Sequence, residues 1–183
     1  MTASVSRRVF FALWPQDEAI AHLSALAREL TPRGGRVIDA DALHLTLAFV
    51  GRVTTAGIDQ LAEIAADVRA EEFDLTLDRL GFWPQGGILW AGCRQTSAPW
   101  RHLAEHLAGS LRAAGFAIDP HGGQRQMPHV TLARRARCTS LPRLGTPIGW
   151  RVDEFTLVES LLQPAGSRYR TLAKFGLEAA DGG

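Results

Sequence analysis

The sequence predicts an α+β fold of two pseudo-symmetric lobes, with antiparallel sheets around a central cleft and helices on the outside. Segments with the two-residue period of strands outnumber those with the helical period, and many follow one another without an intervening helix. A four-residue phrase, His-x-Thr-Leu, occurs at 44–47 and again at 129–132, so its histidines stand 85 residues apart, close to half the chain. Such spacing is typical of two related lobes.

The first half of the chain mixes strands with two helices. Residues 8–13 form an apolar strand that Trp14-Pro15 ends, and Asp17 and Glu18 suit the first turn of the helix that follows. That helix stops at 31–35, and the first His-Thr strand ends near Gly51. The remaining elements expected here are a helix with apolar positions from Ile58 to Val68, a strand over 73–77, a loop over 83–87 and a strand over 88–93.

The second half contains one clear helix and several strands. Trp100, Leu103, Leu107 and Leu111 line one helical face, and Gly115 is suited to end the helix. The second His-Thr strand follows, and strands over 150–158 and 169–175 complete the set. We expect residues 1–183 to form a single domain, with 179–183 as a flexible tail.

Composition excludes several classes of protein. Hydrophobic residues make up 46% of the chain, ample for a normal core, and no apolar run reaches the roughly 18 residues needed to cross a bilayer. Cys93 and Cys138 are too few for a disulfide framework. The sequence therefore predicts a cytoplasmic protein, and a monomer is the default expectation.

The charge is divided unevenly along the chain. Residues 1–91 carry 8 arginines against 12 acidic residues, whereas residues 92–183 carry 12 basic residues against 7 acidic ones. Five arginines flank the second His-Thr phrase, with no acidic residue between Asp119 and Asp153: Arg125, Arg134, Arg135, Arg137 and Arg143. Because the guanidinium group is suited to binding phosphate, this half is expected to bind the anion.

The two phrases bring proton-transfer groups and hydroxyl donors together. Alternation along the first strand places His44 and Thr46 on one face and Leu43, Leu45, Leu47 and Phe49 on the other. In the second strand it places His129, Thr131 and Ala133 opposite Val130 and Leu132. Two imidazoles, each with a hydroxyl on the same face, suit phosphoryl transfer without a metal.

These residues resemble those of the two-histidine phosphoesterase superfamily, which has paired His-x-Ser/Thr-x motifs half a chain apart. Three stretches, at 8–15, 43–51 and 128–134, are similar to the bacterial RNA 2′,3′-cyclic phosphodiesterases, also called 2′-5′ RNA ligase-like proteins. The resemblance implies metal-independent hydrolysis of an RNA-terminal 2′,3′-cyclic phosphate, or of related cyclic nucleotides, to a 2′-phosphate, with no cofactor.

The resemblance also implies residue roles. His44 is then the general acid that protonates the departing 3′ oxygen, and His129 the general base that takes a proton from water. Thr46 and Thr131 hold the non-bridging phosphate oxygens. Arg134, Phe49 and Tyr169 are the substrate-binding residues.

Two alternatives stay open at this level. The same residues could join a cyclic phosphate to a 5′-hydroxyl, as in ligation of cleaved tRNA halves, or the cleft could bind RNA ends without turnover. His102-Leu-Ala-Glu105-His106 spells a zinc-peptidase signature, but a solvated helix face explains it without any chemistry and no third ligand is evident, so no metal site is expected. Trp83, Trp90 and Trp100 are expected in the core and not as base-stacking platforms.

Overall fold

A long, curved antiparallel sheet organises the molecule. The computed structural model describes residues 6–31, 34–118, 127–163 and 166–179. The strand order of the sheet is β10-β9-β1-β3-β7-β6-β5, with β2 paired to β7 at the side, and β4 and β8 form a separate two-stranded sheet. The α+β prediction is confirmed, because all of these strand pairings are antiparallel.

The elements occupy most of the described chain. The strands are β1 Arg7–Leu13, β2 Arg36–Val37, β3 Leu45–Val53, β4 Phe73–Leu77, β5 Arg79–Trp83, β6 Ile88–Gly92, β7 His129–Arg134, β8 Ile148–Val152, β9 Glu154–Gln163 and β10 Gly166–Gly176. The helices are α1 Asp17–Leu30, α2 Thr55–Ala66 and α3 Ala98–Ala113, together with a short 3-10 turn, η1, at Ala40–Ala42.

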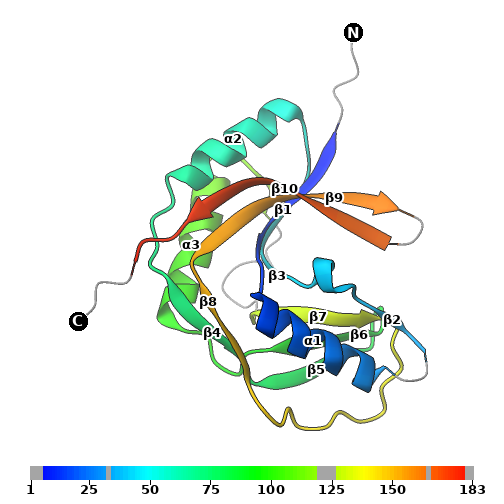
Figure 1. Ribbon diagram of the computed structural model, residues 1–183. Helices are drawn as coiled ribbons and strands as arrows, with labels where there is room; N and C mark the ends of the chain where they lie inside the picture. The colour runs from blue at the N-terminus through cyan, green and yellow to red at the C-terminus, as the bar shows by residue number, and fades with distance from the viewer. Residues whose placement is uncertain (1–5, 32–33, 119–126, 164–165, 180–183) are drawn as a thin grey trace.

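The long sheet consists of two halves that meet at β3 and β7. One half contains β1, β3, β9 and β10, and the other contains β5, β6 and β7 (Figure 1). Between them, Leu45 pairs with Val130. Helices α2 and α3 pack against the first half, whereas α1 packs against β7 and β8. These are the two lobes that the half-chain repeat predicts.

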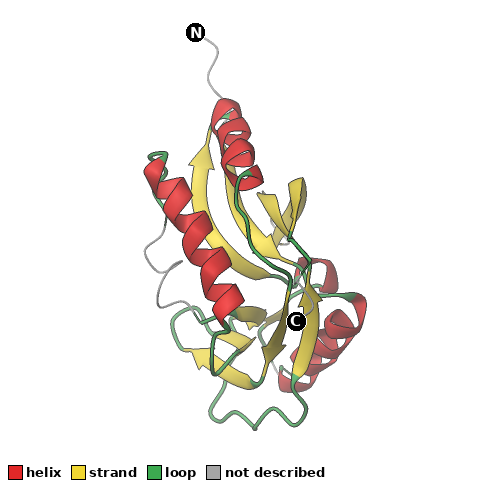
Figure 2. Ribbon diagram, turned by 90° about the vertical axis from the view of Figure 1, so that its left-hand side faces the viewer, coloured by secondary structure: helices red, strands yellow, loops and turns green. Residues whose placement is uncertain are grey.

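The two faces of the sheet have different surroundings. Side chains of all three helices, such as Leu23, Leu61 and Leu107, join the strands in one large buried apolar cluster. The opposite face carries a small cluster around Phe10 and Val158. The helices therefore pack on one face of the sheet, and the other face is left open for a site. Figure 2 shows the helices in red beside the curved strands in yellow.

Local signals in the sequence account for the helix ends. The Thr54 hydroxyl accepts a hydrogen bond from the Gly57 N–H at 3.1 Å, and the Ser97 hydroxyl accepts one from Trp100 at 3.3 Å. Both are N-caps that satisfy otherwise unpaired amides. Gly115 follows α3 with a φ of 87°, the left-handed conformation expected of a helix terminator. Helix α2 ends at Ala66, so Val68 lies beyond it, although its side chain is still buried.

Strand β5 was not predicted: the sequence assigned no element to residues 78–82 and placed Trp83 in a loop, whereas β5 pairs with β6 in a hairpin. Glycine at position 81 concealed this strand, because a glycine inside a strand weakens the usual pattern. The structure requires that glycine. A Cβ atom there would lie 1.9 Å from the indole of Trp90, so the Trp90 ring packs directly over the Gly81 backbone.

The strand predicted over 150–158 is wrong, since it is two strands in two sheets. Strand β8 pairs with β4, whereas β9 pairs with β1 and β10, and Asp153 separates them. The sequence does not reveal the change from one sheet to the other, because both strands are apolar and contribute to the same core. The short β2 and η1 were not predicted either.

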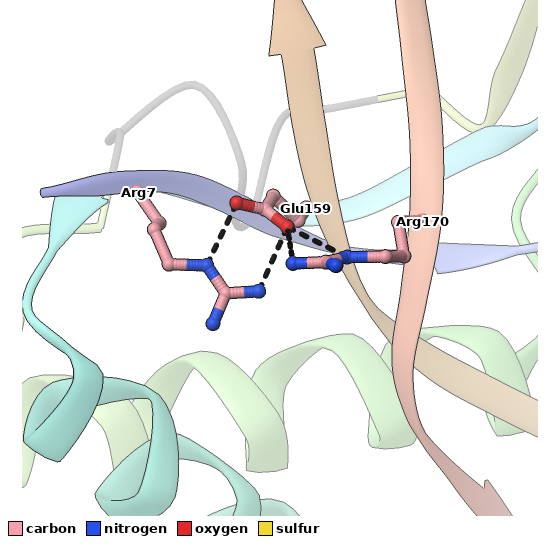
Figure 3. Close-up of polar contacts among 3 residues, drawn as sticks. All are labelled: Arg7, Glu159 and Arg170. Carbon is pink, nitrogen blue, oxygen red and sulfur yellow. Dashed lines mark hydrogen bonds and ion pairs between the residues drawn. The ribbon is translucent and has the colours of Figure 1, made fainter. Parts of the chain in front are cut away.

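A buried carboxylate ties three strands of the first half together. Glu159 of β9 accepts two hydrogen bonds from Arg7 of β1, both 2.7 Å long. It also accepts two from Arg170 of β10, at 2.9 and 2.6 Å (Figure 3). The Glu159 side chain is 6% exposed, and its hydrogen bonds with Arg7 lower its pKa to about 2.

In the described part of the chain, no helix has both the length and the apolar character that a membrane crossing requires. One continuous apolar cluster runs through both halves of the sheet. That cluster is compatible with a single domain over 1–183, which stays a prediction. Of the predicted tail, residues 180–183 lie outside the described chain, as does Arg125.

Candidate active site

The two His-Thr motifs lie on either side of the joint between the halves. Leu45 and Val130, the central residues of the motifs, are paired in antiparallel register and fully buried. Their neighbours on each strand point to the opposite, open face. In a regular antiparallel ladder, diagonal positions such as those of His44 and His129 are roughly 7 to 8 Å apart. The fold thereby directs both histidines and both threonines to one place.

Each motif ends in a β-bulge, which falls on its leucine. In β3 the pairing to β1 skips Leu47, and in β7 the pairing to β6 skips Leu132. The residue after each leucine, Ala48 or Ala133, consequently joins the leucine in the buried core. The residue after that points to the open face. The bulges thus bring Phe49 and Arg134, each five positions after a histidine, to the side of the histidines.

Two expectations from strict alternation are therefore wrong. Phe49 does not share the face of the core leucines but packs with Phe10 on the open face. Ala133 does not accompany His129 and is buried in the core. Phe49 also lines the cavity beside His44, and its substrate-binding role stays a prediction. His44 itself precedes β3, which begins at Leu45, so the first histidine stands at a strand entrance and not within a strand.

Backbone carbonyls orient both imidazoles in the same way. Nδ1 of His44 lies 2.7 Å from the carbonyl oxygen of Ala42, and Nδ1 of His129 lies 3.0 Å from that of Met127, in each case two residues back. A carbonyl can only accept, so Nδ1 carries a hydrogen and donates. In the neutral ring Nε2 then holds the lone pair, which is the form required for a general base.

Burial keeps both imidazoles neutral near pH 7. Desolvation lowers the pKa of His44 to about 4, despite the opposing effect of the Ala42 carbonyl, and the charges of Arg134 and His129 lower it further. The pKa of His129 is also lowered, mainly by burial and to a smaller extent by Arg134. Arg134 therefore lies within electrostatic range of both histidines, and the two histidines lie within range of each other.

A cavity of about 390 Å³ opens beside the first motif. Three arginines, Arg8, Arg36 and Arg134, contribute to its wall, with Asp39 as the acidic contribution. The remaining lining residues are Phe10, Ile38, Ala42, His44, Thr46, Phe49, Ser160 and Tyr169. His129 and Thr131 do not line this cavity. It has the charge and aromatic content to bind a phosphorylated nucleoside.

Aromatic rings surround each histidine. The His44 ring lies 4.8 Å from Tyr169, 5.0 Å from Phe10 and 5.4 Å from Trp14, measured between centroids. The His129 ring lies 4.8 Å from Trp83 and 6.0 Å from Trp90. Trp90 and Trp100 are buried as expected, but the expectation for Trp83 is wrong, because its side chain is 41% exposed.

The zinc-peptidase signature lies on a solvated helix face. His102, Glu105 and His106 of α3 are all exposed, which confirms the solvated-face interpretation. Nδ1 of His106 is 3.3 Å from the carbonyl oxygen of Arg69. Among the residues described by the structure, no group of three or more potential ligands is positioned to hold a metal ion.

A second cavity, of about 340 Å³, lies away from the two motifs and contains neither. Its lining includes Cys93, whose thiol has a pKa raised to about 12 by burial and by the nearby Asp78 carboxylate. The thiol is therefore protonated at neutral pH, which disfavours a role as nucleophile.

Sequence reasoning missed several residues of the candidate site. Arg8 and Arg36 lie in the acidic half of the chain, where the arginine cluster gave no reason to look. Trp14 was interpreted only as a strand terminator, yet its indole N–H donates to the Thr156 hydroxyl at 2.8 Å beside His44. Arg8 could have been found from the two-residue period, since it alternates with Phe10 toward the open face.

Comparisons with known proteins give consistent similarities. Residues 13–90 match the family described as LigT like Phosphoesterase. The RNA 2′,3′-cyclic phosphodiesterase of Escherichia coli is 36% identical over 179 residues, covering 95% of this chain and 98% of that protein. The protein of the same name from Thermus thermophilus is 32% identical, covering 96% and 92%.

Solved structures give the same result. The fold superposes on E. coli LigT in apo form with a TM-score of 0.84 at 31% identity, covering 96% of this chain and 99% of that one. The superposition on E. coli LigT complexed with 3′-AMP has a TM-score of 0.85 at 31% identity, covering 94% and 99%.

Proposed function

The chain belongs to the LigT-like phosphoesterase family of two-histidine enzymes, and we propose that it hydrolyses 2′,3′-cyclic phosphates at RNA 3′ ends. The observation that carries this proposal is the paired Leu45–Val130 position, which directs two carbonyl-oriented imidazoles to one open face. Relatives named RNA 2′,3′-cyclic phosphodiesterase match almost the whole length of the chain and support the same activity.

The reaction is an in-line displacement at phosphorus. We assign His129 as the general base that takes a proton from water on Nε2, and His44 as the general acid that protonates the departing 3′ oxygen. The bond between phosphorus and O3′ breaks, while O2′ keeps the phosphate. This assignment needs a base and an acid on opposite sides of phosphorus, which histidines from two lobes can supply.

Neutral donors and one cation complete the proposed site. Thr46 and Thr131 donate hydrogen bonds to the non-bridging oxygens, where negative charge increases as water attacks. Arg134, turned to the open face by the bulge after the second motif, pairs with the phosphate. Phe49 and Tyr169 contact the terminal nucleoside, since both line the cavity beside His44.

Substrate binding prepares the acid. In the free protein burial lowers the pKa of His44 to about 4, so its ring is neutral at pH 7 and carries no proton on Nε2 to give to the leaving oxygen. An anionic phosphate beside the ring favours the charged form and raises that pKa. Substrate binding therefore favours uptake of a proton from solvent on Nε2 of His44, whereas the proposed base role requires that His129 stays neutral.

The partner is RNA bearing a 2′,3′-cyclic phosphate at its 3′ end. We further propose that the protein acts as a cytoplasmic monomer, without a metal or other cofactor. A monomer suffices because all four motif residues come from one chain.

The test is incubation of an oligoribonucleotide ending in a 2′,3′-cyclic phosphate with the protein in excess chelator. A 2′-phosphate product supports both the activity and the acid–base assignment. A 3′-phosphate product would reverse the leaving group, because O2′ would then depart. Turnover that needs added metal contradicts the metal-independent mechanism, and absence of any opened product contradicts the proposed function as a whole.

A further inference from the structure

Trp83 has a position that hydrolysis does not explain. It lies 4.8 Å from His129, the proposed base, and 41% of its side chain is exposed. Among the residues that the structure describes, only Leu161 is a comparably exposed large apolar side chain. Attack by a water molecule that His129 activates does not require an aromatic surface beside the base. An exposed indole beside an attacking nucleophile is, however, a suitable surface for a nucleobase.

We propose that Trp83 is the stacking platform for a second nucleoside, whose 5′-hydroxyl attacks the cyclic phosphate in place of water. This inference rests on the proposed function and identifies which subsite binds the acceptor. The donor nucleoside has its own aromatic residues on the His44 side, Phe49 and Tyr169. Trp83 lies beside His129, which is the side from which the in-line nucleophile arrives in the proposed mechanism.

The platform is held rigidly from below. Trp83 packs on Trp90 with 5.2 Å between ring centroids. Trp90 in turn lies over two glycines, since a Cβ atom at Gly81 or Gly92 would come within 1.9 or 2.8 Å of its ring. The Arg79 guanidinium lies 4.8 Å from the Trp90 ring centroid, a cation–π distance. A preorganised aromatic surface binds a base at a smaller entropic cost than a free side chain does.

The tip of the β5–β6 hairpin is fastened to the chain that leaves β7. The Arg135 N–H donates to the Gly86 carbonyl and the Ala136 N–H donates to the Gly87 carbonyl, both at 2.9 Å. A Cβ atom on Gly87 would lie 2.6 Å from the Ala136 carbonyl oxygen, so the approach of the two backbones requires glycine. The tip therefore keeps a fixed position relative to the strand that carries His129.

Arg79 is suited to bind the next backbone phosphate of the acceptor oligonucleotide. Its Nε is buried and makes no hydrogen bond to any described residue, and no carboxylate of the described chain is within ion-pair distance of it. Arg79 also stands in register with Gly92 and, across the next strand, with His129. Its side chain thus belongs to the same face as the proposed base.

The chemistry of the joining step is balanced without a further reactant. The 5′ oxygen of the acceptor bonds to phosphorus, and its proton passes to Nε2 of His129. The bond between phosphorus and O3′ breaks, and O3′ takes the proton held by His44. The product is a 2′-5′ phosphodiester with a free 3′-hydroxyl, and the released energy of the strained ring is the driving force.

The experiment compares three nucleophiles with one donor, an oligoribonucleotide ending in a 2′,3′-cyclic phosphate. Water gives hydrolysis, methanol gives a methyl ester, and a 5′-hydroxyl oligoribonucleotide gives the joined strand. In the Trp83→Ala variant we expect the KM for the oligonucleotide acceptor to rise about five- to 100-fold, the loss expected for one base–aromatic stack. Hydrolysis and methanolysis share His129 but use no second nucleoside, so any loss in them should be equal and smaller than the loss in joining.

Two matched variants accompany this test. Trp83→Phe retains a smaller aromatic face and recovers part of the joining activity. Leu161→Ala removes an equally exposed apolar side chain, 40% accessible, away from the cavity lining, and leaves all three reactions unchanged.

Several results would overturn the inference. If Trp83→Ala loses hydrolysis and joining equally, Trp83 serves the reaction of the cyclic-phosphate donor and not the acceptor. If joining is unchanged, Trp83 does not bind the acceptor. A protein that prefers oligonucleotide acceptors no more than methanol has no acceptor subsite. In all of these outcomes the unaltered protein still hydrolyses the cyclic phosphate. If the proposed function itself is wrong, the unaltered protein shows no hydrolysis.

Discussion

At the residue scale, the two histidines are distinguished by the backbone that holds them. Each donates from Nδ1 to a carbonyl two positions earlier, so both expose the same ring nitrogen to the open face. The repeated phrase in the sequence was enough to find these rings and their threonines. It could not reveal the carbonyl partners, because those depend on the backbone course through Ala42 and Met127 and not on side-chain identity.

Removal of either imidazole is expected to cost most of the activity. His44→Ala and His129→Ala should each lower the rate of cyclic-phosphate hydrolysis by about 10² to 10⁴-fold, the usual contribution of one general acid or base. Single-turnover assays on a cyclic-phosphate oligonucleotide measure this loss. His106→Ala, which removes an exposed imidazole from α3, is the control and should retain full activity. Losses below tenfold in both site variants contradict the two-histidine mechanism.

The pKa of His44 predicts different pH profiles for kcat/KM and kcat. The free protein needs protonated His44, whose pKa is about 4, and neutral His129, whose pKa is lowered from its ordinary value. We therefore expect kcat/KM to fall with rising pH already below pH 6.5. The bound phosphate raises the pKa of His44, so the corresponding fall in kcat lies at higher pH. Coincident profiles would contradict a rise in the pKa of His44 on substrate binding.

At the scale of elements, the bulges and the hairpin decide which side chains enter the site. The phrase His-x-Thr-Leu-Ala is repeated in full, and its leucine is the bulged residue in both strands. A period of two predicts His44 and Thr46 correctly but misplaces the residues after the bulge, Phe49 and Ala133. Trp83 was expected in the core and not beside the site, because Gly81 interrupts the strand pattern of β5 and that strand was not recognised.

The ion cluster around Glu159 should contribute measurably to stability. Glu159→Gln leaves Arg7 without its buried partner, and we expect a loss of about 2 to 4 kcal/mol in the free energy of unfolding at pH 7. The value is at the lower end for a buried pair because Arg170 is largely exposed. Urea denaturation measures the change. Glu154→Gln, which breaks an exposed contact with Lys174, serves as the control and should be neutral.

The same variant has a defined pH dependence. The pKa of Glu159 is about 2 in the folded protein, lowered from 4.5, so its stabilisation is complete above about pH 4.5 and disappears as the pH falls toward 2. The difference in stability between the two proteins should shrink over that window. A difference that stays constant down to pH 2 contradicts an ionic origin.

At the scale of the whole molecule, the site belongs to both lobes and depends on their joint. The first lobe supplies His44, Thr46 and Tyr169, and the second supplies His129, Thr131 and Arg134. Period and repeat spacing predicted two lobes and antiparallel sheets. They did not predict the division of 150–158 between two sheets or the arginines of the acidic half, because those depend on pairing between distant segments.

A ligand that touches both lobes should stabilise the fold. A nucleoside 2′-phosphate at about 100 times its Kd adds about 2.7 kcal/mol, or roughly 5 to 10 °C in Tm for a chain of this size. Arg134→Ala should lose most of that increase because the phosphate loses its cation. Differential scanning fluorimetry measures both shifts. Arg137→Ala, three positions further on and also exposed, is the control, and an equal loss in both variants contradicts a specific role for Arg134.

The pairing of Leu45 with Val130 has a mechanical consequence. Any relative rotation of the lobes about that contact moves their outer edges far and moves the residues beside it very little. His44 and His129 immediately precede the two paired residues, so they lie almost on the pivot. A rotation of that kind would widen the entrance for an RNA end and still preserve the spacing between the two histidines. A wide entrance to the site and a fixed distance between the two histidines are thus compatible in one small protein.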